Sequence, residues 1–113
     1  MIHIVKSTEA RPRNSFGVSF DLLAIGPQSM MTKMRYRRDN VIPFHSHLNE
    51  QIGYVLSGRI RVRTRDSQHE LGTGDTYAIP ANVEHCIEII EAAEEVQVFT
   101  PLREDFLRES CRS

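Results

Sequence analysis

Four side chains that can bind a metal ion recur with a spacing that would place them on one face of a sheet. His45 and His47 are two residues apart, so both point the same way on a strand, and Gln51 has the same parity four residues later. His85 begins a later segment whose residues of the same parity are apolar, which indicates that this face points into a core. Imidazole nitrogens suit Zn, Cu, Fe and Ni, and an amide oxygen can complete the set. The alternative is an exposed pair of histidines beside a turn, and the pair alone does not decide between the two.

Strands must position these side chains, because the dominant pattern along the chain has a period of two. Less polar and more polar side chains alternate over Met30–Arg37, Arg59–Arg65, His85–Ile90 and Glu95–Phe99. Clusters of Gly, Pro, Asn, Asp and Ser separate these segments, and short strands at such spacing predict an antiparallel sandwich or barrel. The one helix that we expect is a short turn at Arg103–Arg108.

Length and composition predict one ordinary globular domain over 1–113. Of the 113 residues, 40% are hydrophobic and 26% are charged, and the net charge is −1. This balance argues against a nucleic-acid partner, and no stretch approaches the ~20 apolar residues of a membrane span. The apolar start is too short for a signal peptide, and Cys86 and Cys111 lack paired spacing. We therefore expect a cytoplasmic protein without a disulfide framework, in which Cys86 is a small buried residue.

Arginine dominates the basic residues, since 12 of the 14 are Arg. They concentrate on two strand faces, one with Arg59, Arg61, Arg63 and Arg65 and the other with Lys33, Arg35 and Arg37. A basic stripe for a polyanion is one interpretation. Because the net charge is close to zero, we favour a solvated outer sheet face whose charges are paired by acids on neighbouring elements. The candidate acids are Glu88, Glu91, Glu94 and Glu95.

The segments that hold the histidines resemble the two motifs of the cupin family. Residues 43–58, PFHSHLNEQIGYVLSG, resemble the first motif, G-x5-H-x-H-x3,4-E-x6-G. Residues 74–85, GDTYAIPANVEH, resemble the second motif, G-x5-P-x-G-x2-H-x3-N. The resemblance implies an all-β fold, a double-stranded β-helix or jelly-roll barrel of two antiparallel sheets, with a conserved core over about 30–103. It also implies one divalent transition metal ion, bound by His45, His47, Gln51 and His85.

The sequence departs from the family pattern at the third metal ligand, where Gln51 stands in place of the usual Glu. Glu50 is the rival ligand, but strand parity places it on the opposite face from His47, so we favour Gln51. Three imidazoles and an amide leave the charge of a divalent ion uncancelled, so the site should favour an anionic ligand. The donor set does not separate Zn, Ni, Fe and Mn. The other departures are Asp39, Asn82 and Ile89, which replace two turn glycines and a final Asn.

Residues 97–106, QVFTPLREDF, resemble the D-x-F-[ST]-P-x-R segment of small cupins that act in pectin and alginate breakdown. Those enzymes open the ring of 4,5-unsaturated uronates. The resemblance implies that Gln97, Phe99 and Arg103 are catalytic residues near the metal. Arg103 would clamp a substrate carboxylate and Phe99 would line the sugar ring. The alternatives are an ion pair of Arg103 with Glu104 or Asp105, and core packing of Phe99. Gln97 stands where those enzymes have Asp, and an amide cannot act as a general base.

We therefore expect a metal-dependent, isomerase- or lyase-like enzyme that acts on a sugar acid or keto acid. The substrate-binding residues would be Arg103, Phe99 and Tyr36, and the hydroxyl of Tyr36 or Tyr77 would be available for proton transfer. Gln97 favours a second hypothesis, a non-catalytic cupin that binds a small anionic molecule as a sensor or accessory protein. A metal-dependent dioxygenase is the third hypothesis. Because cupins commonly dimerise through strands, we also expect a homodimer.

Overall fold

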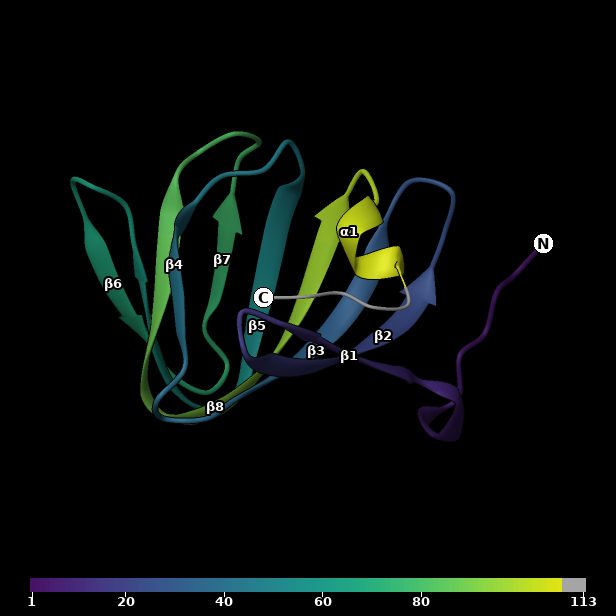
Figure 1. Cartoon of the computed structure of the whole chain (residues 1–113), viewed down its shortest axis with the longest axis horizontal. Coiled ribbons are helices and arrows are strands. Elements are labelled where there is room, and N and C mark those ends of the chain that lie inside the picture. The colour runs from purple at the N-terminus through teal and green to yellow at the C-terminus, as the bar shows by residue number, and fades with distance from the viewer. Residues whose placement is uncertain (109–113) are drawn as a thin grey trace.

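The computed structural model describes residues 1–108, and nearly all of its regular structure is strand (Figure 1). The elements in chain order are η1 Ser7–Glu9, β1 Arg11–Ser15, β2 Val18–Ile25, β3 Met30–Tyr36, β4 Val41–His45, β5 Glu50–Arg63, β6 Gln68–Leu71, β7 Thr76–Ile79, β8 His85–Thr100 and α1 Glu104–Leu107. All the strand pairs that connect β1 to β8 are antiparallel. The all-β prediction is confirmed.

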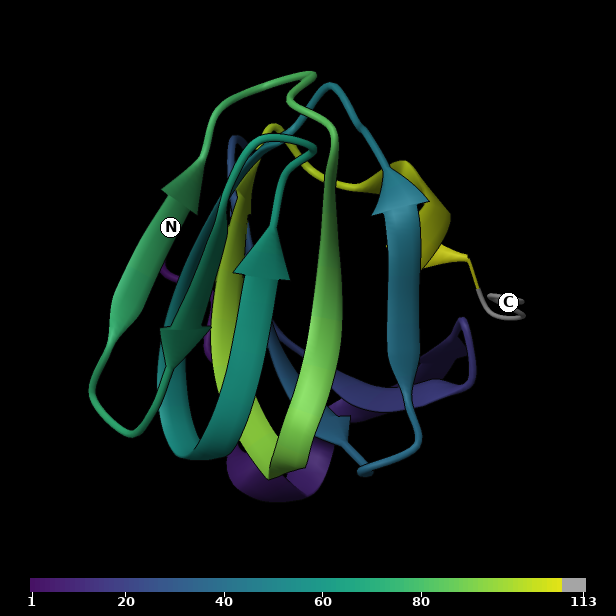
Figure 2. The same ribbon diagram turned by 90° about the vertical axis from the view of Figure 1, so that its left-hand side faces the viewer.

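Two long strands fold the sheet back on itself. Hydrogen bonding runs through the order β1-β2-β3-β8-β5-β6, with β4 beside β8 and β7 beside β5. The first part of β8 pairs with β4 and its last part with β3, while the first part of β5 pairs with β7 and its last part with β6. Both strands curve at the bottom of the barrel in Figure 2. The two layers of the predicted jelly roll are therefore joined by continuous hydrogen bonding.

The bend in β5 depends on Gly58. Its φ of 79° lies in the left-handed region that favours glycine. A Cβ atom there would collide with the carbonyl oxygen of Ala92 and lie 2.6 Å from the Cα of Ala93. The pairing of β5 with β8 shifts register several times between Val55 and Ile60. Glycine is thus needed here both for its backbone angle and for the close approach of β8.

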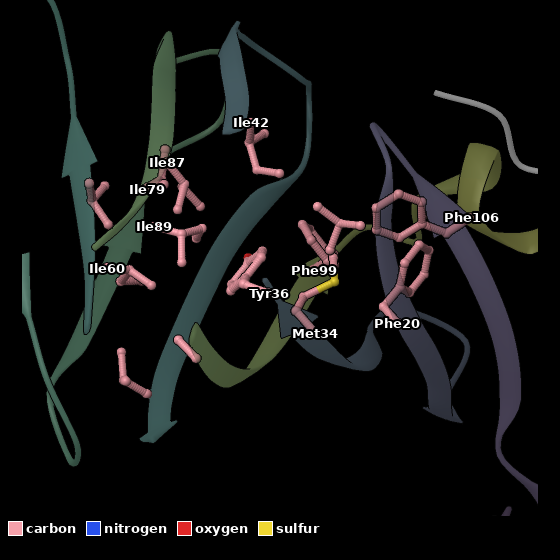
Figure 3. Packing of buried hydrophobic residues seen from close by; sticks show 14 of the residues in the cluster. Phe20, Met34, Tyr36, Ile42, Ile60, Ile79, Ile87, Ile89, Phe99 and Phe106 are labelled. Atoms are coloured by element: carbon pink, nitrogen blue, oxygen red, sulfur yellow. The ribbon is translucent and has the colours of Figure 1, made fainter. Parts of the chain in front are cut away.

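Alternate strand positions supply the core, which lies between the two layers (Figure 3). At one end Phe20, Phe99 and Phe106 are at most 2% exposed, and the ring of Phe106 lies 4.6 Å from that of Phe20. Isoleucines including Ile60 and Ile87 fill the other end. Burial alternates along β3 as the period-two pattern predicts.

Arginines on the outer face of β5 are paired with acids on neighbouring strands. Arg61 and Arg63 donate to Glu88 at 3.1 and 2.9 Å, and Arg61 also donates to Glu70 at 3.0 Å. The paired-face interpretation is therefore confirmed for Glu88. It is wrong for Glu95, which lies inside the barrel with no exposed surface.

One short helix follows the last strand. The predicted turn at Arg103–Arg108 is present as α1, one residue shorter at each end. Within residues 1–108, no helix is long and apolar enough to cross a membrane. Cys86 is buried, as expected of a small core residue, and Cys111 lies outside the described residues.

Candidate metal centre

Three histidine rings gather where β4 ends and β8 begins. His45 is the last residue of β4 and His85 the first of β8, and the two are register partners, while His47 follows in the loop. The ring centroids are 4.4 Å apart for His45 and His85, 5.1 Å for His47 and His85, and 5.5 Å for His45 and His47. One ring nitrogen of each histidine lies within 4.8 Å of the others. The structure therefore brings together the three histidines that the sequence selected, in a cluster consistent with a metal site.

Each of the three rings is oriented by a hydrogen bond from Nδ1 to a backbone carbonyl oxygen. The acceptors for His45, His47 and His85 are the carbonyls of Pro43, Asn49 and Val83, at 2.8, 2.9 and 2.9 Å. Because a carbonyl oxygen only accepts, Nδ1 must carry the proton and Nε2 keeps its lone pair. This arrangement fixes the tautomer of a histidine that binds a metal through Nε2.

Gln51 adds a fourth donor atom beside the cluster. Its Nε2 donates to the hydroxyl of Tyr77 at 3.0 Å, which leaves Oε1 3.0 Å from Nε2 of His47. Both of these atoms are acceptors when Nδ1 of His47 carries the proton, so a cation between them would remove their repulsion. Nε2 of His85 is also buried, and it has no hydrogen-bond partner within residues 1–108. Imidazole nitrogens and an amide oxygen with free lone pairs fit a divalent transition metal.

Burial lowers the pKa of all three histidines, and it takes that of His85 to about 4. The positive charge of Arg103 lowers each pKa further. The three rings are therefore neutral at pH 7. Neutral imidazole is the form that binds a metal ion, so the cluster is prepared for binding without losing protons.

Two cavities adjoin the cluster. The one that contains Tyr36, Gln97 and Arg103 has a volume of about 30 Å³, which suits an ion with about one or two water molecules. A second cavity of about 390 Å³, between β5, β6 and β7, contains Tyr77 and lies within the size range of small-molecule sites. His85 lines both cavities. The smaller space has room for an ion beside the three histidines, and the larger one has the size of a small-molecule site.

Arg103 lies beside the cluster, where its guanidinium contacts two aromatic rings and an acid. Its guanidinium carbon lies 4.0 Å from the ring centroid of Phe106 and 5.2 Å from that of Phe99. Its Nε and Nη2 donate to the carboxylate of Asp105 at 3.2 and 2.7 Å. The ion pair with Asp105, which the sequence analysis gave as an alternative for Arg103, is therefore present. Because Asp105 engages one edge of the guanidinium, Nη1 is the donor that remains outside this pair.

The other predicted site residues take different places. Gln97 Nε2 donates to the hydroxyl of Tyr36 at 3.2 Å, and both side chains line the small cavity. Phe99 has no exposed surface, and its ring packs edge-on against His47 at 5.9 Å, in agreement with the core-packing alternative. Glu50 is exposed on the opposite face of β5, where strand parity predicts it.

Sequence reasoning missed Glu95, because it placed this residue on the charged outer face. The Glu95 carboxylate accepts hydrogen bonds from the hydroxyls of Tyr36 and Tyr77 at 2.6 and 2.7 Å. It also accepts one from the amide of Gln97 at 3.1 Å. Glu95 shares its strand parity with the buried Gln97 and Phe99, so the alternation along β8 carried the correct signal.

Comparisons with known proteins agree with this geometry. A family model described as Cupin domain matches residues 33–100. An RmlC-like cupin from Shewanella frigidimarina NCIMB 400 superposes with a TM-score of 0.84 at 22% identity, over 94% of this chain and 96% of that one. KdgF from Halomonas sp. gives 0.82 at 24% identity, over 91% and 98% of the two chains. The polyketide cyclase RemF from Streptomyces resistomycificus gives 0.75 at 19% identity, over 91% and 81%. No curated protein matches the chain.

Proposed function

This chain belongs to the cupin family, and on that premise we propose that it is a metal-dependent enzyme acting on a small sugar acid or keto acid. The observation that carries the proposal is the pair of acceptor atoms that face each other at 3.0 Å, Nε2 of His47 and Oε1 of Gln51. The segment 97–106 supports the substrate class, because it resembles that of cupins that open 4,5-unsaturated uronates. The fold similarity to KdgF is compatible with this class.

We propose that His45, His47, His85 and Gln51 hold one divalent transition metal ion. Zn, Ni, Fe and Mn all suit these donors. When bound, such an ion supplies a Lewis acid that polarises an oxygen of the ligand. Because all four protein ligands are neutral, they leave the full positive charge of the ion to attract an anion.

Arg103 strengthens the preference for an anion. Its charge already lowers the pKa of the three histidines, so it lies within electrostatic reach of the ion that they would hold. Two positive centres in one small cavity repel each other, and an anionic ligand between them offsets that repulsion. A carboxylate near Arg103 satisfies this requirement, which supports a sugar acid or keto acid as the ligand.

The protein side chains around the small cavity have distinct tasks in this proposal. Nη1 of Arg103 donates to the substrate carboxylate, and Oε1 of Gln97 accepts from a substrate hydroxyl. This Gln97 oxygen is buried and has no partner among the described residues. The hydroxyl of Tyr36 is a further polar group of the cavity. Phe99 acts indirectly, since its ring packs against His47 and lies beneath Arg103.

A non-catalytic anion-binding cupin is the second candidate. Gln97 favours it, because this amide stands where the ring-opening cupins have Asp and cannot take up a proton. The same four metal ligands and Arg103 would serve binding without turnover. The two candidates therefore differ only in whether a bound sugar acid reacts.

We further propose a homodimer that uses the outer face of β3, β8 and β5. This face exposes Met31, Ile52 and Tyr54, at 38%, 46% and 48%. The strand register places Val98 between Met31 and Ile52, so the apolar surface is continuous across three strands. A second copy of the chain offers the same surface and can cover it through a two-fold axis.

The experiment that tests the proposed function is turnover of 4,5-unsaturated galacturonate, followed by loss of the ultraviolet absorbance of its double bond. We expect the metal-loaded protein to exceed the spontaneous rate. Arg103→Lys should raise KM by about 10-fold or more, because Lys cannot make the same planar contacts to a carboxylate. The exposed Arg108 provides the matched control, Arg108→Lys, which should leave KM unchanged. A metal-loaded protein that binds the sugar acid without turnover would establish the second candidate instead.

A further inference from the structure

Glu95 is a buried acid at the centre of a hydrogen-bonded cluster inside the barrel. It has no exposed surface, and its carboxylate accepts from Tyr36, Tyr77 and Gln97 at 2.6, 2.7 and 3.1 Å. Gly53 on β5 makes room for the cluster, since a Cβ atom there would lie 2.6 Å from Oε1 of Glu95 and collide with the ring of Tyr77. Glycine at this position of β5 therefore leaves the space that the Glu95 carboxyl group occupies.

Among residues 1–108, the groups that hydrogen-bond to Glu95 or lie against it carry no positive charge. They are Tyr36 from β3, Tyr77 from β7, Gln97 from β8 itself and the bare backbone of Gly53 from β5. A buried carboxylate without a cationic partner lowers the stability of the fold, and an apolar residue would avoid this cost. Burial outweighs the three hydrogen bonds and raises the pKa of Glu95 to about 7. Near neutral pH this group can therefore either hold a proton or release it.

Two hydrogen-bonded routes lead from Glu95 to the site. Tyr36 connects Oε2 directly to the small cavity, whose wall it forms with Gln97. Tyr77 connects Oε1 to Gln51, and Gln51 in turn lies 3.0 Å from Nε2 of His47. Burial raises the pKa of both tyrosines well above the ordinary value, so each stays a neutral phenol near pH 7. A neutral phenol can relay a proton, because its oxygen accepts one hydrogen bond while its hydroxyl donates another.

Building on the proposed function, we propose that Glu95 is the residue that takes up and returns the substrate proton, acting through the hydroxyl of Tyr36. A polar hydrogen of the bound sugar acid passes to the Tyr36 oxygen while the Tyr36 hydroxyl proton passes to Oε2 of Glu95. The substrate gains one negative charge, Tyr36 is again a neutral phenol, and Glu95 becomes a carboxylic acid. The reverse transfer returns the proton to another atom of the substrate. Glu95 is thus a positioning residue, and Tyr36 is the group that touches the substrate.

The first test is an infrared titration of the zinc-loaded protein. Glu95→Gln keeps the size of the side chain and imitates the protonated acid. Glu91→Gln is the matched control, because Glu91 lies exposed on the same strand. As the pH rises, the wild type and the control should lose one buried carboxylic-acid band with a midpoint near pH 7. Glu95→Gln should lack this band at every pH. Absence of the band from the wild type, or its survival in Glu95→Gln, would overturn the proposal.

The second test measures kcat and KM against pH with 4,5-unsaturated galacturonate. Glu95→Gln should lower kcat by about 100-fold with little change in KM, and it should abolish the ionisation near pH 7 from the kcat profile. Tyr36→Phe should lower kcat similarly, because it breaks the link to the cavity. It should keep the infrared band with its midpoint moved to higher pH, because the carboxylate loses the hydrogen bond from the Tyr36 hydroxyl. Normal turnover by Glu95→Gln would refute the role of Glu95 alone. No turnover by the zinc-loaded wild type would refute the proposed function together with this role.

Discussion

Replacing Glu95 by Gln should make the protein more stable, and by a margin that grows with pH. Inside the fold the pKa of Glu95 is raised to about 7 from an ordinary 4.5, so the folded state binds this proton more tightly than the unfolded state. The stability contributed by that proton is complete below pH 4.5 and is lost as the pH rises through about 7. Gln has no proton to lose, so Glu95→Gln escapes the loss.

The size of the effect follows from the same two pKa values. They differ by about 2.5, and each pKa unit corresponds to about 1.4 kcal/mol, so the full difference is about 3 kcal/mol. Between pH 5 and pH 9 the advantage of Glu95→Gln over the wild type should increase by about 2 to 3 kcal/mol. The side chain is fully buried, so solvent screens little of this difference.

The assay is urea unfolding of both proteins at pH 5, 7 and 9 in the same zinc concentration. The pKa values of His45, His47 and His85 are lowered, so these residues remove stability as the pH falls. Both proteins share that contribution, and it cancels in the difference between them. An advantage that stays constant within about 0.5 kcal/mol from pH 5 to pH 9 would refute the reasoning, because Glu95 would then titrate alike in the folded and unfolded states.

Three further predictions concern neighbouring groups. Gln51→Ala should weaken zinc binding by about 10- to 100-fold in calorimetry, whereas Gln51→Glu should preserve it. Gly53→Ala should lower the free energy of unfolding by about 1–3 kcal/mol, because the new Cβ would press on Glu95. Gly26→Ala is its control, since the nearest atom there lies at an ordinary 3.7 Å, and it should have little effect in the same urea experiment. Ile52→Lys should shift the protein from dimer to monomer in light scattering, and an unchanged mass would contradict the proposed dimer face.

Local pattern predicted β3 and parts of β5 and β8, and together with the resemblance to the cupin motifs it selected the three histidines of the cluster. Period-two alternation identifies β3 and the buried face of β8, because a strand with one buried face must alternate. The same parity separates Gln51, which is buried, from Glu50, which is exposed. The two motifs that carry His45 and His85 are typical of the cupin barrel, and in this barrel the two residues are register partners on β4 and β8.

Glu95 could not be predicted with the same rules, because its burial depends on partners far away in the sequence. Tyr36 lies 59 residues away and Tyr77 lies 18 residues away, and only the closed barrel brings their hydroxyls to one carboxyl group. Sequence reasoning gave more weight to the charge of Glu95 than to its parity, and so placed it outside. Arg103 shows a different limit. The sequence posed an ion pair with Asp105 and a place near the metal as alternatives, whereas the structure contains both.

The central claim is that the three histidines and Gln51 hold a metal ion, and metal content tests it most directly. The comparison is between the purified wild type, His85→Ala and His3→Ala, where His3 is an exposed histidine far from the cluster in sequence. Elemental analysis should find about one divalent transition metal ion per chain in the wild type and in His3→Ala, and a large loss in His85→Ala. Equal metal content in all three proteins would contradict the assignment of the site.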